Sequence, residues 1–242
     1  RPRPVGPGDQ GFRLQARALN LLFASTIESA ERWLPLLERA LPQDRFFLEP
    51  RADIDVALVA APPPGTFDRL PNLKLVQSLW MGVEKLLEDP ELPRHVPFAR
   101  MVDPGMVAAM SETVLACVLD WHRHFWLYRR WQTEKKWKRH RQFMAQDRTV
   151  GFLGLGELGT NAAQKLLALG FRVWGWSRRP KAVAGVHCST DLDEVLSRSD
   201  ALVCLLPLTA QTQGILNAGT LQRIRKGGCV INLARGPHVV VP

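Results

Sequence analysis

The feature that most constrains the fold of this chain is a glycine-rich turn, Gly154-Leu155-Gly156-Glu157-Leu158-Gly159. An apolar strand pattern over residues 150–153 precedes it, and apolar residues follow it at helical spacing: Leu158, Ala162, Leu166 and Leu169. Alone, a G-x-G-x-x-G hexamer is a weak signal, but between a strand and a helix it predicts a dinucleotide-binding turn. There the glycines allow a tight turn, close approach to a pyrophosphate and close helix packing, while the helix N-terminus supplies N–H groups. We therefore expect residues 154, 156, 157, 158 and 159 to bind a cofactor.

The end of the next strand indicates which dinucleotide is bound. NAD is usually held by an acidic residue about 20 residues after the turn, which binds the ribose 2′-hydroxyl. Here the strand over residues 172–176 ends in Ser177-Arg178-Arg179. A hydroxyl and two guanidinium groups can donate hydrogen bonds to a 2′-phosphate, which a carboxylate would repel. The sequence thus predicts NADP(H) in preference to NAD(H), the alternative being a solvated basic turn.

The second half of the chain alternates strand and helix patterns. Strands are expected over residues 150–153, 172–176, 201–206 and 229–233, and helices over residues 157–169, 191–197 and 220–225. Continuous apolar runs such as 201–206 are typical of parallel strands that are covered on both faces. This order predicts a doubly wound, Rossmann-like α/β domain over residues 103–242.

A shorter version of the same pattern precedes it. An apolar run at 19–23, a helix at 29–40 and strands at 56–60 and 74–78 predict a smaller parallel-sheet domain of flavodoxin-like α/β type over residues 18–102. Residues 1–17 are rich in Pro, Gly and Arg, and we expect them to form a disordered leader.

A long helix is predicted between the two domains. Its apolar residues recur at spacings of 4, 3, 4 and 3, which places them on one stripe: Val114, Val118, Trp121, Phe125 and Tyr128. A single helix over residues 112–138 would be about 40 Å long, at 1.5 Å per residue.

Composition limits the kinds of partner, metal site and cellular location that we expect for this chain. The net charge of +9 favours anionic partners. The four cysteines form no C-x-x-C pair, so we expect no metal site, no disulfide framework and a cytoplasmic location. No apolar run reaches the roughly 18 residues that a membrane span needs, so no membrane partner is expected.

Several segments, taken in order, resemble the D-isomer-specific 2-hydroxyacid dehydrogenases, and among them the glyoxylate/hydroxypyruvate reductase A branch. The segments are QSLWMGVEKL (77–86), DPGMVAAMSETVL (103–115), VGFLGLGELG (150–159), GWSRRPK (175–181), LLPLTAQTQGIL (205–216) and INLARGPHVV (231–240). The resemblance covers residues 18–242. It implies a substrate domain (18–102), a dinucleotide-binding domain (103–242), and hydride transfer from NADPH to a small 2-oxo acid, such as glyoxylate or hydroxypyruvate.

The resemblance also implies roles for particular residues. Arg235 follows a strand and matches the family's catalytic Arg, which holds the substrate carboxylate and polarises the carbonyl. Trp80-Met81-Gly82 matches the loop whose backbone N–H groups meet that carboxylate, although the family often has a smaller residue before the Gly. Further cofactor contacts are implied at these positions: Met110, Leu206, Pro207, Thr212 and Ala234. For Met110, a place in the helix core is the alternative.

Two further expectations follow from the resemblance. One is a homodimer formed through the cofactor domain. The other concerns the family's catalytic Glu and His, which lie beyond the ARG motif, whereas this sequence ends seven residues after Arg235. We therefore expect a C-terminally truncated second domain that binds cofactor but lacks the general acid, a group that contributes about 10² to 10⁴ in rate. His238 lies too close to the motif to replace that acid.

Two other function classes stay open. A non-catalytic, corepressor-like sensor of NAD(P) with the same fold is favoured by the missing acid and disfavoured by Arg235. The other is a nucleic-acid binder, suggested by seven Lys or Arg and two Trp between Arg129 and Arg141. Basic residues near a helix C-terminus have a simpler explanation, because they complement the helix dipole. We therefore expect no nucleic-acid partner.

Overall fold

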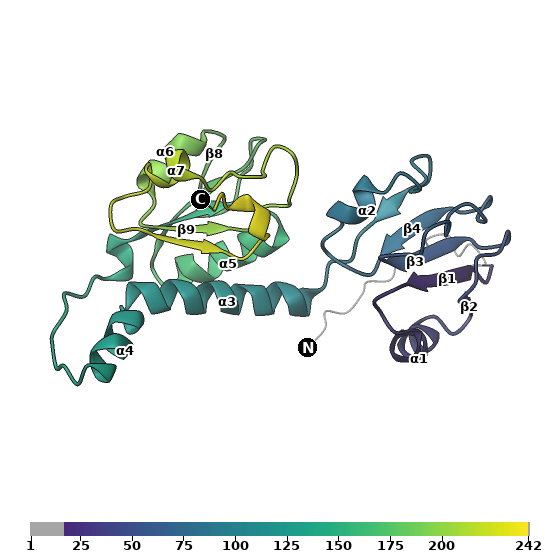
Figure 1. Cartoon of the computed structure of the whole chain (residues 1–242), viewed down its shortest axis with the longest axis horizontal. Coiled ribbons are helices and arrows are strands. Elements are labelled where there is room, and N and C mark those ends of the chain that lie inside the picture. The colour runs from purple at the N-terminus through teal and green to yellow at the C-terminus, as the bar shows by residue number, and fades with distance from the viewer. Residues whose placement is uncertain (1–16, 242) are drawn as a thin grey trace, which may run out of the picture. The chain divides into compact units, whose positions relative to one another are not determined.

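The computed structural model describes residues 17–241, so the leader expected over residues 1–17 lies outside the described residues except at Arg17. The chain divides into two compact units, Arg1–Met101 and Val102–Pro242. Each unit contains one five-stranded sheet in which all strand pairs are parallel (Figure 1). The expected α/β class with two parallel sheets is confirmed.

The sheet of the first unit has the order β2-β1-β3-β4-β5. Its strands are β1 (Asn20–Ser25), β2 (Arg45–Phe47), β3 (Val56–Ala60), β4 (Leu75–Ser78) and β5 (Phe98–Ala99). Its helices are α1 (Ala30–Ala40) and α2 (Glu84–Glu88). The edge strands β2 and β5 and the five-residue α2 are too short to produce a periodic pattern, so the sequence did not predict them.

The sheet of the second unit has the order β10-β9-β6-β7-β8. Its strands are β6 (Thr149–Leu153), β7 (Arg172–Trp176), β8 (His187–Ser189), β9 (Ala201–Cys204) and β10 (Cys229–Asn232). Its helices are α3 (Pro104–His122), α4 (Phe125–Thr133), α5 (Glu157–Ala168), α6 (Leu192–Arg198) and α7 (Ala218–Leu221), with single 3-10 turns η1 (Ala145–Asp147) and η2 (Gly236–His238).

Helices cover both faces of this second sheet. On one face, Phe152 of β6 packs in a cluster with Val114 of α3 and Leu166 of α5. On the other face, Leu153 packs in a cluster with Leu196 of α6. Figure 1 shows α3 and α5 on one side of β9 and α6 on the other. The continuous apolar runs in the strands arise because successive side chains enter two different cores.

The expected helix over residues 112–138 is wrong in its bounds. α3 begins at Pro104, where the Asp103 carboxylate caps it by accepting hydrogen bonds from two backbone N–H groups, and it ends at His122. His124 then adopts a left-handed conformation (φ 56°), and α4 follows. The apolar residues predicted to share one helical stripe, from Val114 to Tyr128, do not all pack against the core. Val114 is fully buried, but Phe125 is 50% exposed. The helix therefore breaks where the core ends.

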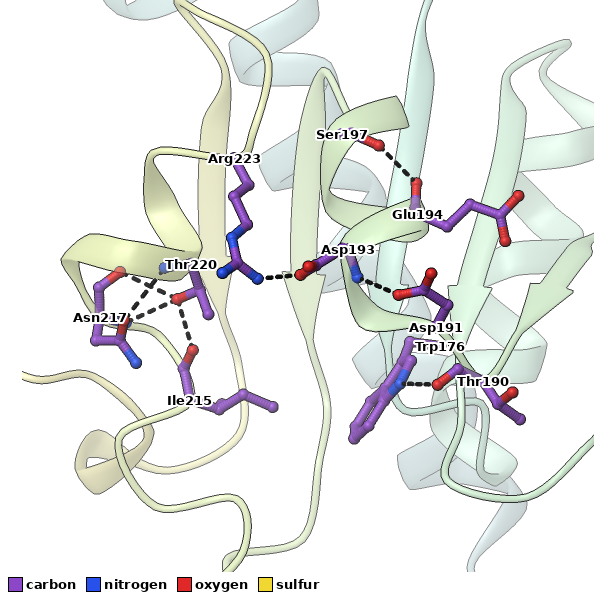
Figure 2. Close-up of polar contacts among 10 residues, drawn as sticks. All are labelled: Trp176, Thr190, Asp191, Asp193, Glu194, Ser197, Ile215, Asn217, Thr220 and Arg223. Carbon is purple, nitrogen blue, oxygen red and sulfur yellow. Dashed lines mark hydrogen bonds and ion pairs between the residues drawn. The ribbon is translucent and has the colours of Figure 1, made fainter.

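The helix expected over residues 220–225 is also wrong in its bounds, because α7 begins at Ala218 and ends at Leu221. A capping box begins α7 at Ala218: the Asn217 side chain accepts a hydrogen bond from the Thr220 N–H (3.2 Å), and the Thr220 hydroxyl accepts one from the Asn217 N–H (2.9 Å; Figure 2). The two short side chains satisfy backbone donors that the first helical turn leaves unpaired.

A buried aspartate fixes the start of the first strand in each unit. Asp55 accepts a hydrogen bond from the backbone N–H of Asn20 (3.0 Å), and Asp200 accepts one from that of Thr149 (2.8 Å). The Asn20 N–H, followed by the Lys74 ammonium at 2.6 Å, lowers the pKa of Asp55. These contacts set where β1 and β6 begin, and therefore where the loops at their carboxyl ends emerge.

Candidate active site

The loops after β6, β7 and β9 meet at one edge of the second sheet. β7 and β9 lie on opposite sides of β6, so the strand order reverses at β6. Ligands of open α/β sheets bind outside the carboxyl ends of the strands at such a point. A cavity of about 490 Å³ lies there, lined by the glycine turn (154–156), the segment 176–181 and three residues after β9, Leu206, Pro207 and Thr212.

The three glycines of the turn have different surroundings. Gly154 has a φ of +99°, which side-chain-bearing residues rarely adopt. At Gly159, a Cβ would lie 2.0 Å from the Gly154 carbonyl oxygen, so α5 can pack this closely only without a side chain. At Gly156, a Cβ would meet no atom within 4 Å, and no side chain caps the start of α5. Open space beside uncapped helical N–H groups fits a pyrophosphate.

A basic loop follows β7 along the cavity. The Ser177 hydroxyl donates a hydrogen bond to the Arg179 carbonyl (2.8 Å), and Arg178 donates one to the Gln211 side chain (2.9 Å). Lys181 donates one to the Leu155 carbonyl of the glycine turn. Within the described part of the chain, the Arg179 guanidinium has no hydrogen-bond or ion-pair partner. The loop therefore brings three cations and no carboxylate to the cavity, which suits an anionic group.

Trp176, Lys181 and Gln211 are residues that the sequence prediction missed. The Trp176 indole lines the cavity and is held by a hydrogen bond to the Thr190 carbonyl (3.0 Å; Figure 2). Lys181 had a signal, because it lies two residues after Arg179 in the same basic turn. Gln211 had none, because its contact with Arg178 joins segments 33 residues apart.

The segment from Pro207 to Thr212 is shaped by its own hydrogen bonds. Thr212 is buried, and its hydroxyl donates to the Pro207 carbonyl (2.7 Å) and accepts from the Thr209 N–H (2.8 Å). Thr212 lines the cavity, and its hydroxyl holds the loop in shape.

Arg235 emerges from a loop that is held on both sides. The Asn232 side chain donates a hydrogen bond to the Arg235 carbonyl (2.9 Å) and accepts one from the Ala234 N–H (3.2 Å). The imidazole of the fully buried His238 accepts a hydrogen bond from the Arg235 N–H (3.2 Å) and lies 3.4 Å from the Pro207 carbonyl oxygen. The Arg235 side chain itself is exposed. This loop places a guanidinium, able to hold a carboxylate, beyond the end of β10.

Several predicted residues do not line the 490 Å³ cavity. They are Met110, Glu157, Leu158, Gly159, Ala234 and Arg235. Met110 is half-buried on α3, and residues 157–159 form the first turn of α5.

Trp80, Met81 and Gly82 belong to the first unit and follow β4. All three are half-buried, and the Trp80 backbone is held by the Ser78 hydroxyl, which accepts from its N–H and donates to its carbonyl (both 3.1 Å). A cavity of about 540 Å³ lies at the carboxyl ends of β1 and β3 in this unit, but these three residues do not line it.

The basic segment that suggested nucleic-acid binding is partly neutralised by ion pairs. Arg129 pairs with Asp120 (2.5 Å), and Glu134 pairs with both Arg130 (3.0 Å) and Lys136 (2.8 Å). Over residues 17–241, no cluster of His, Cys, Asp or Glu is suited to hold a metal ion. Within the same range, no helix is both long and apolar enough to cross a membrane.

The fold and this site define a class of NAD(P)-binding α/β proteins, and comparisons with known proteins identify the family. Residues 115–241 match the family model for the NAD-binding domain of the D-isomer specific 2-hydroxyacid dehydrogenases. A glyoxylate/hydroxypyruvate reductase A from Serratia proteamaculans is 37% identical over 233 residues, which are 92% of this chain and 74% of the relative.

Comparison with solved structures leads to the same family. A D-isomer specific 2-hydroxyacid dehydrogenase from Xanthobacter autotrophicus, in complex with NADPH and MES, has a TM-score of 0.86 at 39% identity. An NADPH-dependent glyoxylate/hydroxypyruvate reductase from Sinorhizobium meliloti, in complex with NADP and sulfate, has a TM-score of 0.82 at 34% identity. Each match covers 92% of this chain and 74% of the longer relative. The chain belongs to the D-isomer specific 2-hydroxyacid dehydrogenase family and is an NAD(P)-dependent dehydrogenase, so the resemblance is confirmed.

Proposed function

We propose that this chain binds NADP(H) in preference to NAD(H) and reduces small 2-oxo acids, with glyoxylate and hydroxypyruvate as its substrates. The observation that carries the cofactor preference is the basic loop 177–181, which borders the cavity without a carboxylate. Two relatives were solved with NADPH or NADP, which supports the same preference. The substrate class rests on the relatives named glyoxylate/hydroxypyruvate reductase.

In this proposal, Arg235 is the catalytic residue. Its guanidinium binds the substrate carboxylate through two parallel hydrogen bonds and places positive charge near the carbonyl oxygen, where negative charge develops. Asn232 and His238 hold its backbone, as described above. In the Trp80-Met81-Gly82 loop, the backbone N–H groups of Met81 and Gly82 are proposed to bind a substrate carboxylate, whereas the Trp80 N–H donates to the Ser78 hydroxyl. When bound, the nicotinamide would supply the hydride that the 2-oxo carbon accepts, and water would supply the proton that the resulting alkoxide takes up.

The remaining cofactor contacts belong to the same proposal. Gly156, with Glu157 and Leu158 in the first helical turn, presents backbone N–H groups to the pyrophosphate. Ser177, Arg178 and Arg179 bind the 2′-phosphate. The other proposed contacts are Met110, Gly154, Gly159, Leu206, Pro207, Thr212 and Ala234.

The cofactor preference is tested by titrating NADPH and NADH against the wild type and the Arg178→Ala/Arg179→Ala variant. We expect about a hundredfold loss of NADPH affinity, because two charge-assisted hydrogen bonds are removed, and less than about a threefold loss for NADH. Arg39→Ala/Arg45→Ala removes the same charge from exposed sites of the first unit and should change neither affinity. Equal losses for both cofactors would refute the 2′-phosphate assignment.

Turnover is tested by the loss of 340 nm absorbance when the chain is mixed with NADPH and glyoxylate or hydroxypyruvate. Turnover that disappears in Arg235→Gln is the expected result. NADPH binding without turnover of either acid would refute the reductase proposal for this chain and favour the cofactor-sensing alternative.

We further propose a homodimer formed through the second unit. α4 and the segment after it expose three aromatic side chains, Phe125 (50% exposed), Trp126 (49%) and Trp137 (98%), which a second copy would cover. Sedimentation velocity should show a dimer that Trp126→Lys dissociates, whereas a monomeric wild type would refute the proposal.

We also propose a cytoplasmic location, which the four cysteines support because they are free thiols.

A further inference from the structure

Glu28 belongs to none of the motifs above, yet its carboxylate holds two indole rings. Oε2 accepts a hydrogen bond from Trp33 Nε1 (3.0 Å), and Oε1 accepts one from Trp80 Nε1 (2.8 Å). Trp33 lies on α1, whereas Trp80 follows β4 and is 52 residues away from Glu28. One carboxylate therefore ties the loop after β1 to both α1 and the loop after β4.

Glu28 is itself held in place. Its backbone N–H donates to the Ser25 hydroxyl (2.7 Å), and that hydroxyl donates to the Ala60 carbonyl at the end of β3 (2.6 Å). The hydrogen bond from Trp33, then the one from Trp80, lowers the pKa of Glu28. The carboxylate is thus ionised near neutral pH, the form that accepts from both indoles at once.

The same contacts restrain the Trp80-Met81-Gly82 loop. The Trp80 ring packs against the apolar cluster beneath α1, and its N–H reaches the Glu28 carboxylate. Its carbonyl accepts hydrogen bonds from the Ser78 hydroxyl (3.1 Å) and from the Met101 N–H (3.3 Å). Side chain and backbone of Trp80 are therefore held from different elements, and only the indole contact depends on a distant charged residue.

We propose that Glu28 is a positioning residue for substrate binding, which acts by holding the Trp80 indole so that the 80–82 loop keeps the backbone N–H groups of Met81 and Gly82 in place for the substrate carboxylate. This inference rests on the proposed role of that loop. A loop that is already ordered before binding loses less conformational freedom when the substrate arrives. Releasing the indole should therefore weaken substrate binding while the cofactor site is unaffected.

The test uses Glu28→Leu, Trp80→Phe and the double variant, with Trp33→Phe as the matched control. Trp33→Phe removes the other hydrogen bond to the same carboxylate and leaves Trp80 attached. We expect Glu28→Leu and Trp80→Phe each to raise the glyoxylate KM about tenfold, the lower end of what one hydrogen bond to a charged group contributes, with kcat unchanged. The double variant should be no worse than either single variant, because both remove the same contact. Trp33→Phe should stay within about twofold of the wild type, and NADPH affinity should not change in any variant.

The outcomes separate this inference from the proposed function. No turnover by the wild type would overturn the proposed function, and this inference with it. Turnover with an unchanged KM in Glu28→Leu, additive effects in the double variant, or an equal loss in Trp33→Phe would overturn this inference alone.

Fluorine NMR of protein labelled with 5-fluorotryptophan checks that the change is local. Trp33→Phe and Trp80→Phe identify the two signals by their absence. Glu28→Leu should shift those two signals and leave the other six tryptophans unchanged. Those six tryptophans all lie in the second unit, so shifts in their signals would mean that the effect of Glu28→Leu extends beyond the first unit, and would overturn the local role.

Discussion

Replacing Gly159 by Ala separates packing from cofactor binding in the glycine turn. The new Cβ would lie 2.0 Å from the Gly154 carbonyl oxygen, and contacts below 3.0 Å are essentially never seen, so α5 must move away by about 1 Å. Overpacking costs about 1 to 3 kcal/mol, and we expect about 3 kcal/mol here because the obstacle is backbone rather than a flexible side chain. In a domain of this size, the loss corresponds to about 6 to 12 °C in Tm.

Gly156→Ala is the matched control in the same turn. Its Cβ meets no atom within 4 Å, and its φ of −71° suits alanine, so the free energy of unfolding should change by less than about 1 kcal/mol. The added methyl group instead enters the space where the backbone approaches the pyrophosphate. We expect NADPH affinity to fall at least about tenfold, because the backbone N–H groups are held away from the phosphate oxygens.

Two measurements distinguish the stability effect of Gly159→Ala from the binding effect of Gly156→Ala: scanning calorimetry gives Tm, and a fluorescence titration gives the affinity for NADPH. Gly159→Ala should show the lower Tm, and Gly156→Ala should show a near-normal Tm with weak binding. A Gly159→Ala protein as stable as the wild type would refute the packing argument. Normal NADPH binding by Gly156→Ala would refute the placement of the pyrophosphate.

Three further predictions concern the second unit. Asp200→Ala should cost about 3 kcal/mol in urea unfolding, because the buried Thr149 N–H loses its acceptor; a loss below about 1 kcal/mol would contradict this. Burial, followed by nearby positive groups, lowers the pKa of His122 below 6.5, so the unfolded chain takes up a proton that the folded chain resists. Stability should therefore fall as the pH drops below about 6.5, and His122→Phe should reduce this fall; an identical pH dependence would count against it. His238→Ala should lower kcat/KM for glyoxylate about tenfold without changing NADPH affinity, because the Arg235 N–H loses its acceptor, and unchanged kcat/KM would exclude a supporting role.

The sequence by itself determined the fold class, the family and many of the residues that line the cavity beside the glycine turn. These depend on local patterns: apolar runs that mark strands with two buried faces, a glycine turn between a strand and a helix, and a basic loop one strand later. Eight predicted residues line the cavity because they lie in loops that follow strands whose order the α/β pattern implies: Gly154, Gly156, Ser177, Arg178, Arg179, Leu206, Pro207 and Thr212.

Only the tertiary structure decided where helix α3 ends and which side chains from distant segments form hydrogen bonds with each other. α3 ends at His122 because the core ends there, although the apolar spacing continues to Tyr128. Gln211 reaches Arg178 across 33 residues, and Glu28 reaches Trp80 across 52. Such contacts depend on where two distant loops emerge from a sheet. A polar side chain in a loop carries no periodic signal, so only the folded chain shows which charge or indole it meets.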